Sequence, residues 1–168
     1  AITQSVFPAI LHAKNQSEKL YHARLQRLYD LMVWLAVAVA LPTTFLSGWL
    51  IGLLFGKEYS QAGGVLAIHI WAGVFVFIGV ASGKWLLSEN MQIFSFFRTG
   101  LGAFSNVILN LALIPVWGIY GAAVATLLSQ MIASYIGYAF TKKTLTNFRM
   151  QTKSFFWPLR QLKSASLK

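Results

Sequence analysis

The sequence contains no cysteine and very few acidic residues, and both absences narrow the class of protein. Without cysteine there is no disulfide and no thiolate metal site. Only 11% of the 168 residues are charged, too few to cover the surface of a soluble domain of this size. The acidic residues lie outside or at the edges of the long apolar stretches, and the three histidines are scattered. We therefore expect no catalytic residues, no metal site and no cofactor. The acidic residues are Glu18, Asp30, Glu58 and Glu89.

Hydrophobic residues, in contrast, make up 57% of the chain, and the mean hydropathy is +0.60. In soluble domains, hydrophobic residues seldom exceed half of the chain. We predict transmembrane helices at residues 31–55, 65–87, 99–115 and 119–140, because each stretch is close to the ~20 residues that a hydrocarbon core of ~30 Å requires. The apolar runs are continuous, whereas a barrel would show alternation. The predicted fold class is all-α, a polytopic transmembrane helix bundle.

The segments that flank these helices are more polar. Residues 1–30 are interpreted as the end of a preceding apolar helix plus a cytoplasmic connecting helix, and residues 141–168 as a basic cytoplasmic tail. Because the chain starts within an apolar helix, we expect further protein upstream; the alternative is a trimmed or mature N-terminus. The tail mixes cations with aromatic residues, which fits either a stretch lying on an anionic leaflet or a basic terminus without fixed structure.

The net charge of +10 is unevenly distributed along the chain. The cations flank the apolar runs, a pattern typical of membrane orientation rather than of nucleic-acid binding. With four crossings, twelve of the Lys and Arg residues lie on one side and only Lys57 on the other, while Lys84 falls inside the second helix. The positive-inside rule then places both ends of this segment in the cytoplasm.

The stretch NVILNLALIPVWGIYGAAVATLLSQ, residues 106–130, predicts a tight hairpin. Pro115 lacks an amide hydrogen and Gly118 accepts positive φ, so the chain can turn there. Small residues then recur every four positions along the last helix, a spacing that lets helices approach closely in lipid. These predicted packing residues are Gly121, Ala125, Ser129, Ala133 and Gly137.

Four polar residues in or beside the predicted helices are candidates for binding a substrate. Asn106 and Asn110 share one helix face and could either bond a neighbouring helix or form a polar wall facing a cavity. Lys84 inside a span costs ~2.5–3.5 kcal/mol on insertion scales, so it either anchors the helix, by snorkelling or pairing with Glu89, or faces an anionic substrate. Arg98 lies at the mouth of the third helix, where it could attract the same substrate.

These motifs together resemble the penultimate hairpin of bacterial polysaccharide and O-antigen flippases, which belong to the multidrug/oligosaccharidyl-lipid/polysaccharide exporter superfamily. The family pattern is an asparagine pair, LIP, a glycine and GAA-ATxxS, and residues 106–129 match it. VFPAI at 6–10, LLFGKEY at 53–59 and SGKWLLSEN at 82–90 are similar to other family segments, so the resemblance covers residues 6–140.

The resemblance implies that this chain is part of the C-terminal lobe of a two-lobed transporter, whose N-terminal lobe it lacks. The implied activity is the flipping of undecaprenyl-diphosphate-linked oligosaccharide repeat units from the cytoplasmic to the outer leaflet of the bacterial inner membrane by alternating access. The implied partners are the lipid-linked oligosaccharide, the bilayer and other assembly proteins for O-antigen or another surface polysaccharide. The alternatives are an exporter of drugs or another lipid-linked precursor, a membrane glycosyltransferase, and a non-transporting scaffold.

Overall fold

The computed structural model describes residues 2–165, without the side chains of Ile2, Gln4 and residues 162–165; Ala1 and residues 166–168, including Lys168 of the predicted tail, lie outside the described residues. The fold class is all-α as predicted, since every regular element in the described part of the chain is a helix. The elements are α1 (Ile2–Gln16), α2 (Glu18–Phe55), the short 3₁₀ helix η1 (Lys57–Tyr59), α3 (Ser60–His69), α4 (Ala72–Ser88), α5 (Gln92–Ser134), the 3₁₀ helix η2 (Ile136–Tyr138), α6 (Leu145–Phe155) and α7 (Trp157–Ala165).

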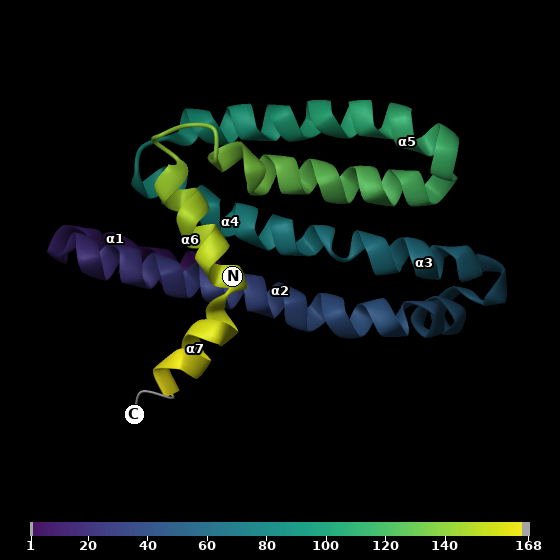
Figure 1. Ribbon diagram of the computed structural model, residues 1–168, viewed down its shortest axis with the longest axis horizontal. Coiled ribbons are helices and arrows are strands. Elements are labelled where there is room, and N and C mark those ends of the chain that lie inside the picture. Colours follow the sequence, from purple (N-terminus) through teal and green to yellow (C-terminus); the bar gives the residue numbers. More distant parts are fainter. Residues whose placement is uncertain (1, 166–168) are drawn as a thin grey trace.

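Long apolar rods lie side by side along the molecule (Figure 1). Within the described residues, three segments are long and apolar enough to cross a membrane: Glu18–Phe55, Lys57–Ser88 and Gln92–Tyr138. The third segment is folded in two, so that α5 forms a first arm, residues 92–117, and an antiparallel second arm, residues 119–134. The bundle thus contains four rods, and that each of the four crosses a bilayer once stays a prediction.

Gly118 makes the fold in α5. Its φ of 55° and ψ of −131° lie in a region that side-chain-bearing residues rarely adopt, and the two arms meet there. Three residues later, a methyl group at Gly121 would lie 2.3 Å from the backbone oxygen of Leu113. The hairpin therefore depends on one glycine for its backbone angle and on another for the close approach of its arms.

The rods differ in detail from the predicted helices. The first rod is continuous with the connecting helix, because α2 begins at Glu18. The second is interrupted at Ile70 and Trp71, where the amides of Gly73 and Val74 bond three residues back and the indole of Trp71 donates to Thr44 Oγ1 at 3.0 Å. The last rod leaves α-helical geometry after Ser134 instead of continuing to residue 140.

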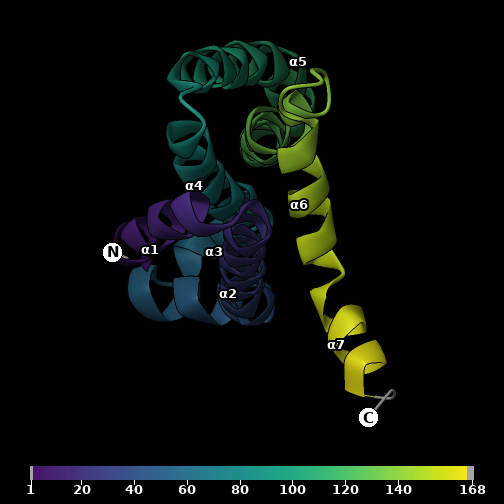
Figure 2. The same cartoon turned by 90° about the vertical axis from the view of Figure 1, so that its left-hand side faces the viewer.

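The end of the chain is folded onto the bundle. Helix α6 crosses the rods near the end that also carries α1, and it contacts both α2 and α4 (Figure 2). Its polar residues Asn147, Gln151 and Ser154 recur at helical spacing and are fully buried. Over Leu145–Phe155 the predicted tail is therefore an ordered, packed helix and not a terminus without fixed structure.

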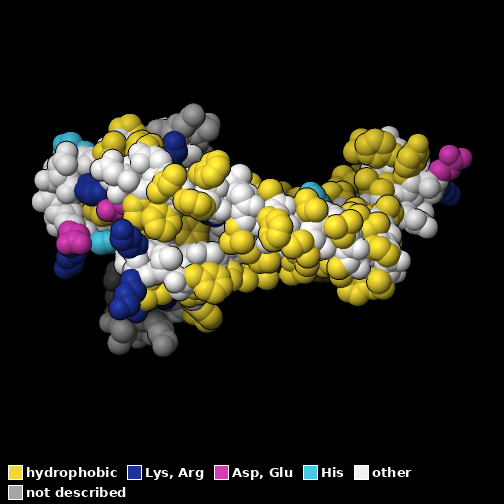
Figure 3. Space-filling model, turned by 90° about the horizontal axis from the view of Figure 1, so that it is seen from above, with side chains coloured by type: hydrophobic (Ala, Val, Ile, Leu, Met, Phe, Trp, Pro, Cys, Tyr) yellow, Lys and Arg dark blue, Asp and Glu magenta, His cyan; other side chains and the backbone are white. Residues whose placement is uncertain are grey.

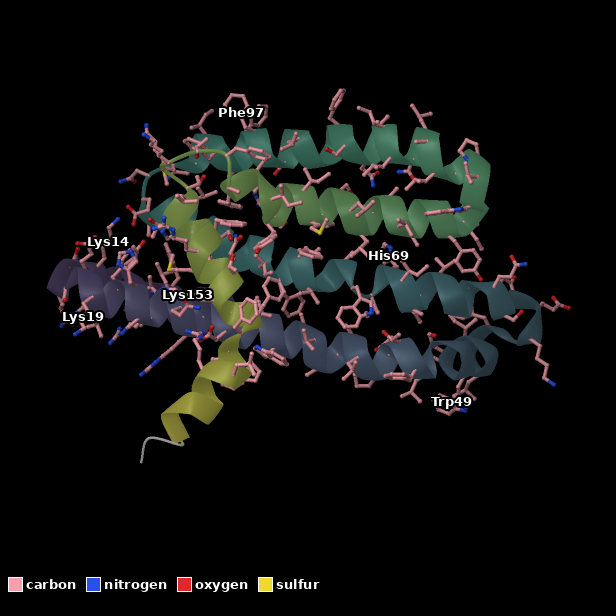
Figure 4. The ribbon with its side chains drawn as sticks, viewed as in Figure 1. Lys14, Lys19, Trp49, His69, Phe97 and Lys153 are labelled. Carbon is pink, nitrogen blue, oxygen red and sulfur yellow. The ribbon has the colours of Figure 1, made fainter. Side chains whose placement is uncertain are left out.

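Charged side chains gather at the two ends of the molecule, and hydrophobic side chains cover its middle. On the face shown in Figure 3, most Lys and Arg side chains lie at the end with α1 and α6. Large apolar side chains such as Phe45 (81% exposed) and Leu111 (73% exposed) project from the rods between the two ends. Trp49 and Phe97 likewise point away from the bundle in Figure 4. An apolar belt of this kind is the surface that a helical membrane protein presents to lipid.

Candidate functional site

A row of polar side chains runs down the inner face of the first arm of α5. Arg98, Asn106 and Asn110 lie at multiples of four residues, with Gly102 between the first two, so they are stacked over about 18 Å at 1.5 Å per residue. The amide of Asn106 donates to Ser129 Oγ on the second arm at 3.1 Å, and the amide of Asn110 donates to Asn106 Oδ1 at 3.0 Å. Asn106 therefore bonds to the neighbouring arm, whereas Asn110 bonds to Asn106 within its own arm.

A groove of about 400 Å³ lies between the two arms of α5, on the Arg98 side of this row. Arg98, Thr99 and Asn106 line it from the first arm, and Thr126, Ser129, Gln130 and Ser134 from the second. Its walls therefore combine one cation with hydroxyl and amide groups. Asn110 is absent from the lining, although it holds Asn106 in place.

Arg98 is the centre of this site. Its Nη1 donates to Ser134 Oγ at 3.3 Å, and its guanidinium carbon lies 6.0 Å from the centre of the Tyr138 ring. Its Nε is buried and has no hydrogen-bond partner among the described residues. Neither of the ion pairs found among residues 2–165, Lys14–Glu89 and Arg160–Asp30, involves Arg98. A part-buried guanidinium without a carboxylate partner is well suited to bind an anion.

A second, apolar pocket of about 280 Å³ lies on the other side of Arg98. The side chains of Phe94, Phe97, Leu101 and Phe140 supply most of its walls, and Arg98 itself lines both this pocket and the polar groove. The guanidinium thus stands at the boundary between a hydrogen-bonding surface and a hydrophobic one.

The row of small residues on the second arm faces the first arm. Ala125 is fully buried, Ser129 accepts the bond from Asn106, and a methyl group at Gly102 would lie 2.8 Å from the Cβ of Ala133. Gly137 is different, because it lies in η2 beyond the end of α5 and so is not on the helix face on which the spacing placed it.

Lys84 lies apart from the other candidate residues. Its ammonium group is 5.1 Å from the centre of the Phe7 ring on α1, and it lines neither the groove nor the apolar pocket. The alternative of a pair with Glu89 is wrong, because Glu89 accepts a bond from Tyr21 at 2.6 Å and pairs with Lys14 at 3.1 Å. Arg98, Asn106 and Asn110 come together in the structure, whereas Lys84 does not join them.

Sequence reasoning missed a buried polar cluster that supports this end of the site. The hydroxyl of Tyr29 on α2 donates to Asn147 Oδ1 on α6 and lies 3.1 Å from Ser82 Oγ on α4. The amide of Gln151 donates to Ser82 Oγ at 2.7 Å and to the backbone oxygen of Ser134 at 3.1 Å. The side chain of Ser134 accepts a bond from Arg98, so α6 is linked to the groove through Ser134. The helical spacing of Asn147, Gln151 and Ser154 is a pattern that could have revealed the packed face of α6.

These features define the class: the chain is a multi-pass helical membrane protein whose rods enclose a polar groove headed by an arginine. No protein-family model matches the chain, and no solved structure matches it.

The curated relatives carry names from glycan assembly. The chain is 24% identical to the capsular polysaccharide biosynthesis protein CapF of Staphylococcus aureus, over 85% of this chain and 36% of that protein. Two proteins of Haloferax volcanii also match: a probable low-salt glycan biosynthesis flippase, Agl15 (24% identical, 94% of this chain and 33% of that protein), and a probable flippase, AglR (31% identical, 81% and 29%). The chain spans about a third of the length of these relatives. Two of the three are named as flippases, which are transporters rather than enzymes.

Proposed function

We propose that this chain forms part of the C-terminal lobe of a flippase that moves undecaprenyl-diphosphate-linked oligosaccharide repeat units from the cytoplasmic to the outer leaflet of the bacterial inner membrane. The product would serve the synthesis of O-antigen or another surface polysaccharide. The N-terminal lobe of the same protein would supply the opposite wall of the passage, and the two lobes would alternate in opening to either side. The related proteins named as flippases support the general activity.

The position of Arg98 between a polar and an apolar surface carries the proposal. A lipid-linked oligosaccharide has a sugar part, a diphosphate and a hydrocarbon chain, in that order. The polar groove offers hydroxyl and amide groups to the sugar, the apolar pocket offers aromatic walls to the hydrocarbon, and the guanidinium between them offers charge-assisted hydrogen bonds to the diphosphate. The order of the three surfaces matches the order of the three chemical parts.

Asn106 and Asn110 have distinct parts in this proposal. Asn106 lines the groove and can bond a sugar hydroxyl, whereas Asn110 positions the Asn106 amide through their mutual bond. The groove volume of about 400 Å³ holds only part of an oligosaccharide, which fits a single wall of a larger cavity.

The test is to replace Arg98 in the full-length protein. In a strain whose flippase gene is deleted, Arg98→Gln should restore less than a tenth of the wild-type surface polysaccharide, because charge-assisted bonds are worth ~1.5–3 kcal/mol each. Arg98→Lys should restore an intermediate amount, since it keeps the charge and loses the planar fork. Lipid-linked repeat units should accumulate in both variants, and protein levels in the membrane are measured to match expression.

Two further substitutions serve as comparisons. Lys57→Gln removes a cation at the opposite end of the rods and should restore the polysaccharide fully. Lys84→Ala should restore most of it, because its cation–π contact with Phe7 anchors α4 to α1 outside the groove. Full activity of Arg98→Gln at matched expression would contradict the proposal. Complete loss of surface polysaccharide with Lys84→Ala would indicate that Lys84 contacts the substrate.

A further inference from the structure

A basic groove of about 430 Å³ lies at the end of the bundle where α6 crosses α2, outside the site described above. Arg149 and Lys153 line it from the exposed face of α6, Arg160 from α7 and His22 from α2. No acidic side chain is among the described residues that line it. Figure 4 shows Lys153 at the same end of the molecule as Lys14 and Lys19. The groove is thus an anion-attracting surface that neither Arg98 nor the hairpin uses.

An apolar slot of about 300 Å³ lies next to this groove. Trp34 and Trp157 line it as a packed aromatic pair with ring centres 6.2 Å apart, and Leu31 and Leu35 complete its hydrocarbon lining. The indole of Trp34 is held by donating to the backbone oxygen of Ser154 at 3.0 Å. Paired tryptophans between an apolar belt and a charged end are typical of the lipid headgroup level.

The groove and the slot meet at one ion pair. Arg160, which lines the groove, donates to Asp30, which lines the slot, at 2.8 Å. Arg27 also lines the slot, so cations lie on both sides of the junction. One molecule with an anionic head and a hydrocarbon tail can occupy both surfaces at once.

We propose that this junction of α2, α6 and α7 binds one anionic phospholipid of the leaflet that this end of the bundle meets. The phosphate lies against Arg149, Lys153 and Arg160, and an acyl chain lies in the slot against Trp34 and Trp157. The lipid thereby holds α6 and α7 across the end of the bundle. Charge complementarity selects an anionic over a zwitterionic lipid, and the slot selects a lipid over free phosphate.

The experiment measures lipid retention by the purified full-length protein. Native mass spectrometry in detergent compares added phosphatidylglycerol, phosphatidylcholine and inorganic phosphate. We expect bound phosphatidylglycerol, with an affinity about 25-fold lower in Arg149→Gln/Lys153→Gln, because each basic side chain near an anionic lipid contributes a factor of about five. Trp157→Ala should weaken phosphatidylglycerol binding as well, since it removes one wall of the slot.

A matched control removes the same charge elsewhere. Lys19→Gln/Lys142→Gln changes two exposed cations at this end of the molecule that do not line the groove, and it should bind the lipid like the wild type. An equal loss of lipid affinity in the control would show that net charge alone attracts the lipid, and it would overturn the proposal. Equal binding of phosphatidylcholine, or competition by inorganic phosphate at the affinity of the lipid, would also overturn it. Surface polysaccharide is measured in the same variants, so that a failure of this site is distinguished from a failure of the proposed flippase activity.

Discussion

At the scale of single residues, a few buried polar side chains make the hydrogen bonds that connect distant helices. Tyr29, Asn147 and Gln151 are all fully buried, and their bonds connect three helices that are far apart in sequence. Asn147 Nδ2 and Gln151 Oε1 are left without partners among the described residues, as is the hydroxyl of Tyr138. In an apolar surrounding each remaining bond then carries more weight, because no water replaces it when it is lost.

The first prediction concerns the hydroxyl of Tyr29. Tyr29→Phe keeps the ring but removes the bonds to Ser82 and Asn147, so it should lower the free energy of unfolding by about 1–3 kcal/mol. Thermal unfolding of the full-length protein in detergent measures the change. Tyr120→Phe is the matched control, because the Tyr120 hydroxyl makes a 3.3 Å bond at the surface, and it should stay within about 0.5 kcal/mol of the wild type. An equal change in the free energy of unfolding for the two variants would contradict a stabilising role of the buried cluster.

At the scale of elements, the hairpin of α5 holds the groove in shape. The two arms are fixed by the backbone angle at Gly118, the close contact at Gly121 and the bond between Asn106 and Ser129. The polar side chains that line the groove come from both arms, so a change in the angle between them would separate Arg98 from Ser134. Helix α6 braces the same end through the bond of Gln151 to the backbone of Ser134.

The second prediction separates the two glycines of the hairpin from an ordinary helical glycine. Gly118→Ala should cost about 1–3 kcal/mol through backbone strain alone, because no atom lies within 4 Å of the added methyl group. Gly121→Ala should cost at least as much, since its methyl group would overlap the backbone of Leu113. Gly100→Ala, in open space on the first arm, should be neutral or stabilise by up to about 1 kcal/mol. Unfolding in detergent is again the measurement, and a neutral Gly118→Ala would contradict the turn.

At the scale of the whole molecule, charge and hydrophobic surface are separated along the length of the rods. The apolar belt lies in the middle, most cations gather at the end with α1 and α6, and Lys57 and Glu58 are at the turn between α2 and α3. The four rods bring α6 back to the end of the molecule that carries α1. The positive-inside rule then predicts that this end lies in the cytoplasm.

The third prediction tests that orientation. The chain lacks cysteine, so Lys57→Cys and Lys142→Cys can be introduced singly into a cysteine-free full-length protein. A membrane-impermeant thiol reagent added to intact cells should label position 57, and position 142 should react only after permeabilisation. The four-rod topology has three crossings between the two positions, so reactivity of both from the same side would show an even number of crossings and overturn it.

Much of this protein could be predicted from its sequence, because the properties concerned are local. The length of an apolar run and the need to pair every backbone amide in lipid make each run a helix, and Pro115 with Gly118 marks a turn whatever lies nearby. The spacing of the small residues on the second arm likewise indicated a packing face. The exception, Gly137, failed because the helix ends at Ser134.

Only the tertiary structure decided which polar side chains meet. The choice of Lys14, not Lys84, as the partner of Glu89 depends on how α1 lies against α4, and the packing of α6 depends on a polar patch contributed by α2, α4 and α5. Arg98 and Ser134 are 36 residues apart, and their contact exists because the hairpin folds one arm back on the other. Helix formation in lipid follows from the chain itself, whereas a binding groove is a property of surfaces that come together only when the rods have packed.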